Sequence, residues 1–239
     1  INAYTDFDCT CYYISLPSEF VMEGLEVLAE LAFHSTFTKE DVEVEKDIIL
    51  EEMVQNTLDP ETNFLQFVQD AAFTNYPLKR PILGTKESIK KASYKELRSF
   101  YHKYYQPHNS FLVIAGEAEF NQLKSMIEEL FDDWNSHSKL IFPDFKQFLE
   151  PIFPPLPYLS KSSSQLFIAF VLPELSDKHP LSNAMLIAIR YLAIGRSSRL
   201  FKRLVEGEKL ASAVKVSSIS GIMTGVSAIV VYPINEKSI

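Results

Sequence analysis

The stretch DVEVEKDIILEEMVQN, residues 41–56, has the pattern of an amphipathic helix with one irregularity. At about 100° per residue, three apolar side chains form a single stripe along this helix: Val42, Ile49 and Met53. Glu45 and Glu52 are seven residues apart, so two turns bring them within about 20° of one direction, beside that stripe. The sequence therefore predicts a helix that carries two carboxylates on its packed edge.

Two carboxylates on a packed edge require a partner, because a buried charge without one is costly. One explanation is an ion pair between each glutamate and a neighbouring lysine or arginine. The other is that at least one carboxylate binds a cation or lines a catalytic pocket. The pattern of this helix does not choose between the two explanations, and both stay open at this point.

The composition is that of a globular protein with enough apolar residues for a sizeable core. The chain has 239 residues, of which 46% are hydrophobic and 23% charged, and this length favours two domains. A formal net charge of −8 argues against nucleic acid or an anionic membrane surface as the main partner. No apolar run approaches the roughly 20 residues that span a bilayer. Because the chain begins with Ile1 and stops just after an apolar run, we expect a fragment of a longer protein.

Hydrophobic periodicity predicts helices and strands along the whole chain. Strands are expected at 9–15, 111–116 and 164–172, with a closing pair on either side of Gly221. Helices are expected at 19–33, 41–56, 60–73, 87–91, 93–104, 119–134, 180–194 and 197–207. Thr38 is the expected N-cap of the helix over 41–56, with Asp41 as its capping partner.

The order of these elements indicates an α+β fold with mixed, largely antiparallel sheets flanked by helices. A stretch with five prolines, 135–158, has neither a helical nor a strand period and is expected to be a linker. Strands and helices occur on both sides of it, which predicts two related, incomplete domains, 1–134 and 159–239.

Several kinds of catalytic site are absent from the sequence. It contains no glycine-rich phosphate loop and no G-x-S-x-G motif, and no two of its five histidines have metal-binding helical spacing. The residues alone therefore offer two unusual glutamates and no complete site.

Five stretches together resemble the pitrilysin/insulinase family of zinc metallopeptidases, the inverzincins, which carry an H-x-x-E-H motif. NAYT at 2–5 is similar to the family's N-A-[YF]-T strand, and EVEKDIILEEM at 43–53 is similar to its E-R-x-V-I-x-x-E helix. The other three are PLKRPILGT at 77–85, typical of the mitochondrial-processing-peptidase branch, YHKYYQPHNSFLVIAGE at 101–117 and SSRLFKRL at 197–204. Their order along the chain is that of the family.

The resemblance implies roles for residues of two of these stretches. The family holds zinc with the two histidines of H-x-x-E-H and a glutamate of the later helix, so Glu52 is the implied zinc ligand. Glu45 matches a catalytic-site carboxylate that orients a zinc-binding histidine or the water. Family members also bind peptides as a strand added to a sheet edge, which implies substrate contacts for Asn2, Ala3 and Tyr4.

Two departures from the family pattern limit what these residues can do. H-x-x-E-H is absent, and we expect it before the NAYT strand. The 239 residues then contain at most one zinc ligand, so we expect them to be inactive by themselves and not to retain zinc. In addition, Val205 and Ser212 stand where relatives have the arginine and tyrosine of R-E-x-x-G-L-x-Y, which grip the substrate. Unless the alignment has slipped by one or two residues, a second half or a partner subunit supplies this grip.

The function implied for the intact protein is that of a zinc metalloendopeptidase. It would hydrolyse peptide bonds in unfolded or short peptides with a metal-activated water. The alternative is a non-catalytic homologue that acts as a structural or substrate-holding subunit. An H-x-x-E-H motif ahead of Ile1 would favour the enzyme.

Overall fold

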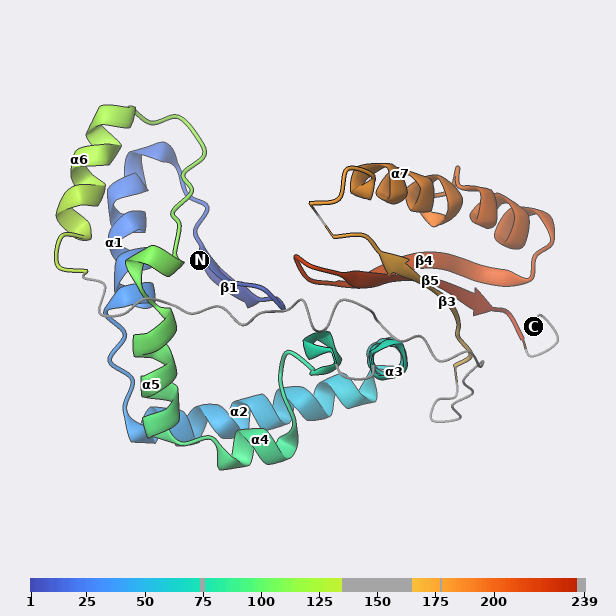
Figure 1. Cartoon of the computed structure of the whole chain (residues 1–239), viewed down its shortest axis with the longest axis horizontal. Helices are drawn as coiled ribbons and strands as arrows, with labels where there is room; N and C mark the ends of the chain where they lie inside the picture. The colour runs from blue at the N-terminus through green and yellow to red at the C-terminus, as the bar shows by residue number, and fades with distance from the viewer. Residues whose placement is uncertain (74–75, 135–164, 177, 236–239) are drawn as a thin grey trace. The chain divides into compact units, whose positions relative to one another are not determined.

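The computed structural model describes residues 1–73, 76–134, 165–176 and 178–235 (Figure 1). The chain divides into two compact units: the described parts of 1–50 and 85–143 form the first, and those of 51–84 and 144–239 form the second. Helices combine with antiparallel sheets, which confirms the α+β class. The expected linker, 135–158, lies outside the described residues, and the two expected domains, 1–134 and 159–239, stay a prediction.

The first unit combines a β-hairpin with helices. Strands β1 (Asn2–Thr5) and β2 (Thr10–Tyr13) pair antiparallel, with Ala3 opposite Tyr12. The helical elements are η1 (Ser18–Phe20), α1 (Val21–Phe33), the first part of α2 (Lys39–Leu58), α4 (Lys86–Lys91), α5 (Tyr94–Tyr104), η3 (Pro107–Asn109) and α6 (Phe120–Leu130). The predicted helices of this unit are thus confirmed, with ends that differ by a few residues.

Aromatic side chains hold the helices and the hairpin of this unit together. The ring centre of Phe33, at the end of α1, lies 3.5 Å from the ring centre of Trp134 and 5.3 Å from that of Phe131. Both of these residues follow the end of α6. The hydroxyls of Tyr12 in β2 and Tyr105 after α5 are 2.9 Å apart. Burial raises the pKa of Tyr105, because the phenolate would lose its hydration there.

The start of α2 is fixed by the predicted capping pair. Thr38 Oγ1 accepts a hydrogen bond from the Asp41 amide at 3.1 Å, and Asp41 Oδ2 accepts one from the Thr38 amide at 2.7 Å. These two bonds form a reciprocal cap that satisfies amides without a helical partner. The Thr38 amide and the Thr38 hydroxyl, which donates to Asp41 Oδ2 at 2.8 Å, hold the pKa of Asp41 below its usual value, because both bonds stabilise the carboxylate.

The second unit is built on a three-stranded antiparallel sheet. Its strands are β3 (Ile168–Glu174), β4 (Ala211–Ser220) and β5 (Gly225–Pro233), in the spatial order β3-β5-β4. The helical elements are α3 (Pro60–Ala72), η2 (Pro77–Lys79), α7 (Ser182–Ala193) and η5 (Phe201–Gly207), which is a π-helix. The closing strand pair around Gly221 is thus confirmed as β4 and β5.

Both faces of this sheet are covered, which explains why β5 is buried along nearly its whole length. Successive side chains of a strand point to opposite faces. Ile229 and Val231 of β5 pack on one face in a cluster with Ala193 of α7. On the other face Lys215 of β4 pairs with Glu61 of α3 at 2.8 Å. The sheet therefore lies between α7 and α3, as Figure 1 shows.

Two expectations are corrected. Residues 111–116 were expected to form a buried strand, but they are not paired with any described residue, and Phe111 and Val113 are 88% and 74% exposed. An apolar run becomes a strand only where a neighbouring strand takes up its amides and carbonyls. The helix expected over 197–207 is present, but its residues Phe201–Gly207 are wound as a π-helix.

No helix in the described part of the chain is both long enough and apolar enough to cross a bilayer.

Candidate metal centre

Helix α2 carries both glutamates that the sequence singled out. Val42 is 5% exposed, and Ile49 and Met53 are half-buried, so the predicted apolar stripe is its covered face. Glu45 and Glu52 are exposed, however, so the packed edge predicted for them is wrong in the described residues. At about 100° per residue the two glutamates point between Ile49 of the stripe and its neighbour Ile48, and Ile48 is itself 53% exposed, so this flank of α2 is open in the described residues.

The surroundings of Glu45 and Glu52 show whether either carboxylate pairs with a lysine or an arginine. Within the described residues, neither Glu45 nor Glu52 makes a hydrogen bond or an ion pair, and the nearby Lys46 binds Glu43 instead, at 2.7 Å. Because both carboxylates are exposed to solvent, they carry no cost of burial that a partner would have to offset. The ion-pair explanation therefore has no support in the described part of the chain.

The donor set was tested for its fit to zinc. Structural zinc sites have about four protein ligands and catalytic sites about three, drawn from Cys, His, Asp and Glu. The described residues contain no group of three or more such side chains close enough to hold a metal ion. The carboxylate of Glu52 is a ligand of the right type and has no competing partner in this part of the structure, so it fits as one ligand of a larger set.

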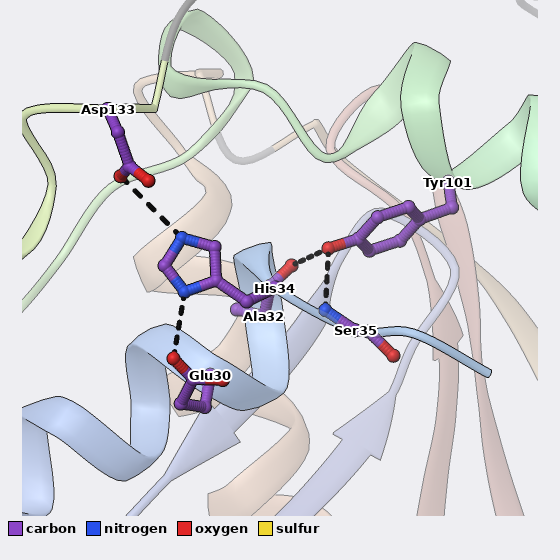
Figure 2. A network of polar contacts seen from close by, with 6 residues as sticks. All are labelled: Glu30, Ala32, His34, Ser35, Tyr101 and Asp133. Atoms are coloured by element: carbon purple, nitrogen blue, oxygen red, sulfur yellow. Dashed lines mark hydrogen bonds and ion pairs between the residues drawn. The ribbon is translucent and has the colours of Figure 1, made fainter.

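The segment between α1 and α2 is held by a polar network, drawn in Figure 2. The Tyr101 hydroxyl of α5 donates to the Ala32 carbonyl at 3.1 Å and accepts from the Ser35 amide at 3.3 Å. It thereby ties the last turn of α1 and the residues that follow to α5. The pKa of Tyr101 is raised, chiefly because its hydroxyl is partly buried.

A histidine completes this network. His34 Nδ1 lies 3.0 Å from Glu30 Oε1 of α1, and His34 Nε2 lies 3.6 Å from Asp133 Oδ1 beyond α6. The sequence analysis considered the five histidines only for metal-binding spacing and did not predict this positioning role of His34. The available signal was the four-residue spacing between Glu30, in the last turn of the predicted helix 19–33, and His34, the residue just after it.

The residues matched to substrate binding lie on β1. Asn2, Ala3 and Tyr4 are all exposed, and β1 pairs with β2 along one edge only within the described residues. A strand with a free edge presents unpaired amides and carbonyls that an extended peptide can take up. The described geometry is therefore compatible with strand addition at these residues.

The positions matched to the substrate grip are occupied by structural contacts. Val205, in η5, is partly buried and packs against the hydrophobic cluster of the second unit. Ser212 Oγ donates to the Tyr232 carbonyl at 3.2 Å, across the β4–β5 pair. Neither side chain has the charged, forked donor set of an arginine or the reach of a tyrosine.

Two sequence profiles of one peptidase family match the chain. "Insulinase (Peptidase family M16)" matches residues 1–86, and "Peptidase M16 inactive domain" matches residues 91–238. The chain is 28% identical over 217 residues to the uncharacterized zinc protease YmxG of Bacillus subtilis, covering 90% of this chain and 51% of that protein. It thus spans about half the length of this curated relative.

Solved structures show the same fold. A protease from Helicobacter pylori superposes with a TM-score of 0.86 at 20% identity, covering 98% of this chain and 58% of that one. The ferredoxin protease FusC, solved in complex with Arabidopsis ferredoxin, gives 0.69 at 24% identity, covering 97% and 26%. Together with the profile that matches 91–238, these likenesses confirm the resemblance that the sequence motifs indicated, and the chain belongs to peptidase family M16, the insulinase family.

Proposed function

We propose that this chain forms part of a zinc metalloendopeptidase in which Glu52 is a zinc ligand and Glu45 orients a zinc-binding histidine or the water. The observation that carries the proposal is that both carboxylates stand exposed on one continuous helix, within the stretch that matches the M16 profile. Seven residues correspond to about 10.5 Å along the axis and about 20° of rotation. This spacing supports one carboxylate at the metal and one behind another ligand.

The chemistry divides between the metal and the residues of this chain. Zinc, when bound, supplies a Lewis acid and lowers the pKa of its water towards neutrality. Glu52 would contribute one oxygen and one negative charge to the site. Glu45 would accept a hydrogen bond from an imidazole N–H and so fix the orientation of that ring. Both glutamates belong to the helix α2.

We propose unfolded or short peptides as substrates, bound as an added strand along β1. The exposed edge at Asn2, Ala3 and Tyr4 supports this proposal, because strand addition uses backbone hydrogen bonds and tolerates many sequences. An extended segment must be available to pair, which favours chains without stable structure.

We further propose that a second half or a partner subunit supplies the substrate grip. Val205 and Ser212 make packing and backbone contacts and offer no charged donor. The share of the matched structures that this chain covers, 58% of the Helicobacter pylori protease and 26% of FusC, is compatible with both a separate and a fused partner.

One observation favours a second candidate, a non-catalytic homologue that acts as a structural or substrate-holding subunit. The profile that matches residues 91–238 is described as an inactive domain, and the 239 residues contain no H-x-x-E-H. This candidate gives Glu52 no metal to bind, so metal content separates the two.

The test is zinc content and peptidase activity of the longer protein that contains these residues. Glu52→Gln should abolish zinc retention and activity, and Glu45→Gln should lower metal affinity or activity by about 10–100-fold. Glu51→Gln is the matched control, because Glu51 is an exposed neighbour on the same helix and should leave both unchanged. Undiminished zinc content in Glu52→Gln would contradict the assignment. The 239 residues alone should neither retain zinc nor cleave peptides.

A further inference from the structure

A cavity of about 320 Å³ opens in the first unit, apart from the proposed zinc ligand. One side is formed by residues 35–39, which connect α1 to α2, and the other by the side chains of α5. Ligand pockets for small molecules begin at about 300 Å³. The cavity is therefore large enough for a small organic ligand and much larger than a single ion requires.

Two side chains that line the cavity carry positive charge, Lys39 and Arg98. In the described part of the chain, no carboxylate pairs with Lys39 or Arg98. Two acidic residues, Glu40 and Asp41, directly follow Lys39 in the sequence, but neither lines the cavity, and the carboxylate of Asp41 is bound to Thr38 through the capping pair. The lining of the cavity, all of it described, thus contains positively charged side chains and no carboxylate, in a chain with a net charge of −8.

Arg98 is held in place by its neighbours. Its Nη1 donates to the Tyr94 hydroxyl at 2.6 Å, its Nε donates to His102 Nε2 at 3.3 Å, and its guanidinium carbon lies 5.9 Å from the centre of the Tyr94 ring. The Nη2 group has no partner among the described residues. An ordered guanidinium with free N–H groups suits a carboxylate or phosphate, whose oxygens it can bind in a fork.

Aromatic rings form the apolar part of the lining. The Phe37 ring lies edge-to-face with Tyr94 at 5.9 Å and with Tyr101 at 6.0 Å between ring centres. This packing keeps the rings in fixed positions beside the two cations. The lining thus combines donors for an oxyanion with a surface for a flat apolar group.

We propose that this cavity binds a small ligand that carries a phosphate or carboxylate group on a flat apolar body. Arg98 and Lys39 bind the oxyanion, and Phe37 contacts the body. The site lies outside the residues proposed to bind zinc or peptide, so its failure would leave the peptidase proposal intact.

The experiment is calorimetric titration of the 239-residue chain, at low ionic strength, with inorganic phosphate, phenyl phosphate and benzoate. Phenyl phosphate should bind saturably and more tightly than inorganic phosphate, because only phenyl phosphate has a ring to contact Phe37. Benzoate distinguishes the two sources of the oxyanion: tighter binding than phenyl phosphate identifies a carboxylate site, and weaker binding identifies a phosphate site.

Three variants test which residues act. Arg98→Gln and Lys39→Gln should each weaken binding of the tighter aromatic probe by about tenfold or more, the effect of a lost charge-assisted hydrogen bond. Lys95→Gln is the control, because Lys95 is exposed on α5, carries the same charge and does not line the cavity. It should change the dissociation constant less than twofold. Circular dichroism establishes that each variant is folded, and Lys39 is exposed, so its replacement leaves the fold intact. Absence of saturable binding, or binding that both Gln variants leave unchanged, would overturn the proposal.

Discussion

Replacing Lys209 with glycine should stabilise the second unit. Lys209 joins η5 to β4 and has φ 53°, the only positive φ of a non-glycine residue in the described chain. Its neighbours hold this turn on both sides: the Glu208 amide donates to the Arg203 carbonyl at 2.7 Å, and the Leu210 amide donates to the Leu204 carbonyl at 2.8 Å. The backbone therefore cannot relax to a negative φ without losing these bonds.

The magnitude follows from two opposing terms. A left-handed conformation costs a residue with a Cβ about 1–2 kcal/mol. Glycine removes this strain, but its greater freedom in the unfolded chain costs about 0.5–1 kcal/mol. The Lys209 side chain is exposed and makes no ion pair in the described residues, so its loss adds little. The net expectation is a gain of about 0.5–1 kcal/mol in the free energy of unfolding.

The assay is urea unfolding of the 239-residue chain, monitored by circular dichroism. The unfolding free energies of the variants are compared where their m-values are equal. Lys209→Ala is the control, because it removes the charge and keeps the Cβ, and it should leave the unfolding free energy within about 0.5 kcal/mol of the parent. A glycine variant that is less stable than the alanine variant would refute the reasoning, since it would show that the turn does not strain a residue with a Cβ.

Two other predictions concern the second unit. Lys215 holds the pKa of Glu61 below its ordinary value of 4.5, so the stabilisation by this pair should be complete above pH 4.5 and disappear as the pH falls below it. Lys215→Met should weaken that acid-side dependence at a cost of no more than about 1 kcal/mol, because both side chains are partly exposed. Acid unfolding curves of the two proteins test this, and an unchanged dependence would show that the prediction is wrong. Phe73 is completely buried, so Phe73→Ala should cost about 3–5 kcal/mol in urea unfolding. Phe120→Ala, at a residue 74% exposed, should change stability by about 0.5 kcal/mol or less, and similar losses in the two variants would contradict the packing described here.

Elements with a clear period were predictable from the sequence. The helices α1, α3 and α5 and the pair β4–β5 were expected close to where they lie, because periodic burial of apolar side chains determines each of them. The capping pair of Thr38 and Asp41 is local and was also predicted. Such features depend on neighbours within a few residues.

Features without a local signal in the sequence were not predictable. The run 111–116 has the apolar composition of a strand, but composition does not supply a pairing partner. The winding of Phe201–Gly207 as a π-helix leaves no mark in the hydrophobic pattern that separates it from an α-helix. The bond from Tyr101 to Ala32 joins residues 69 apart, and neither has a sequence signal for the contact.

The candidate site divides in the same way. The seven-residue spacing of Glu45 and Glu52 identified the two carboxylates, and the motif resemblance supplied their proposed roles. Their exposure was not predictable, because it depends on what covers the flank of α2 at Ile48. The cavity beside Arg98 was also missed, since it forms only where residues 35–39 meet α5.

The most direct test of the zinc assignment is a crystal structure of the longer protein, determined from diffraction data collected at the zinc absorption edge. We expect an anomalous peak with a Glu52 carboxylate oxygen at about 2.0–2.2 Å, the usual zinc–carboxylate distance. Glu45 should lie beside the peak and hydrogen-bond to another zinc ligand or to the bound water. A zinc ion bound without Glu52, or a Glu52 carboxylate paired with a lysine or arginine, would contradict the account.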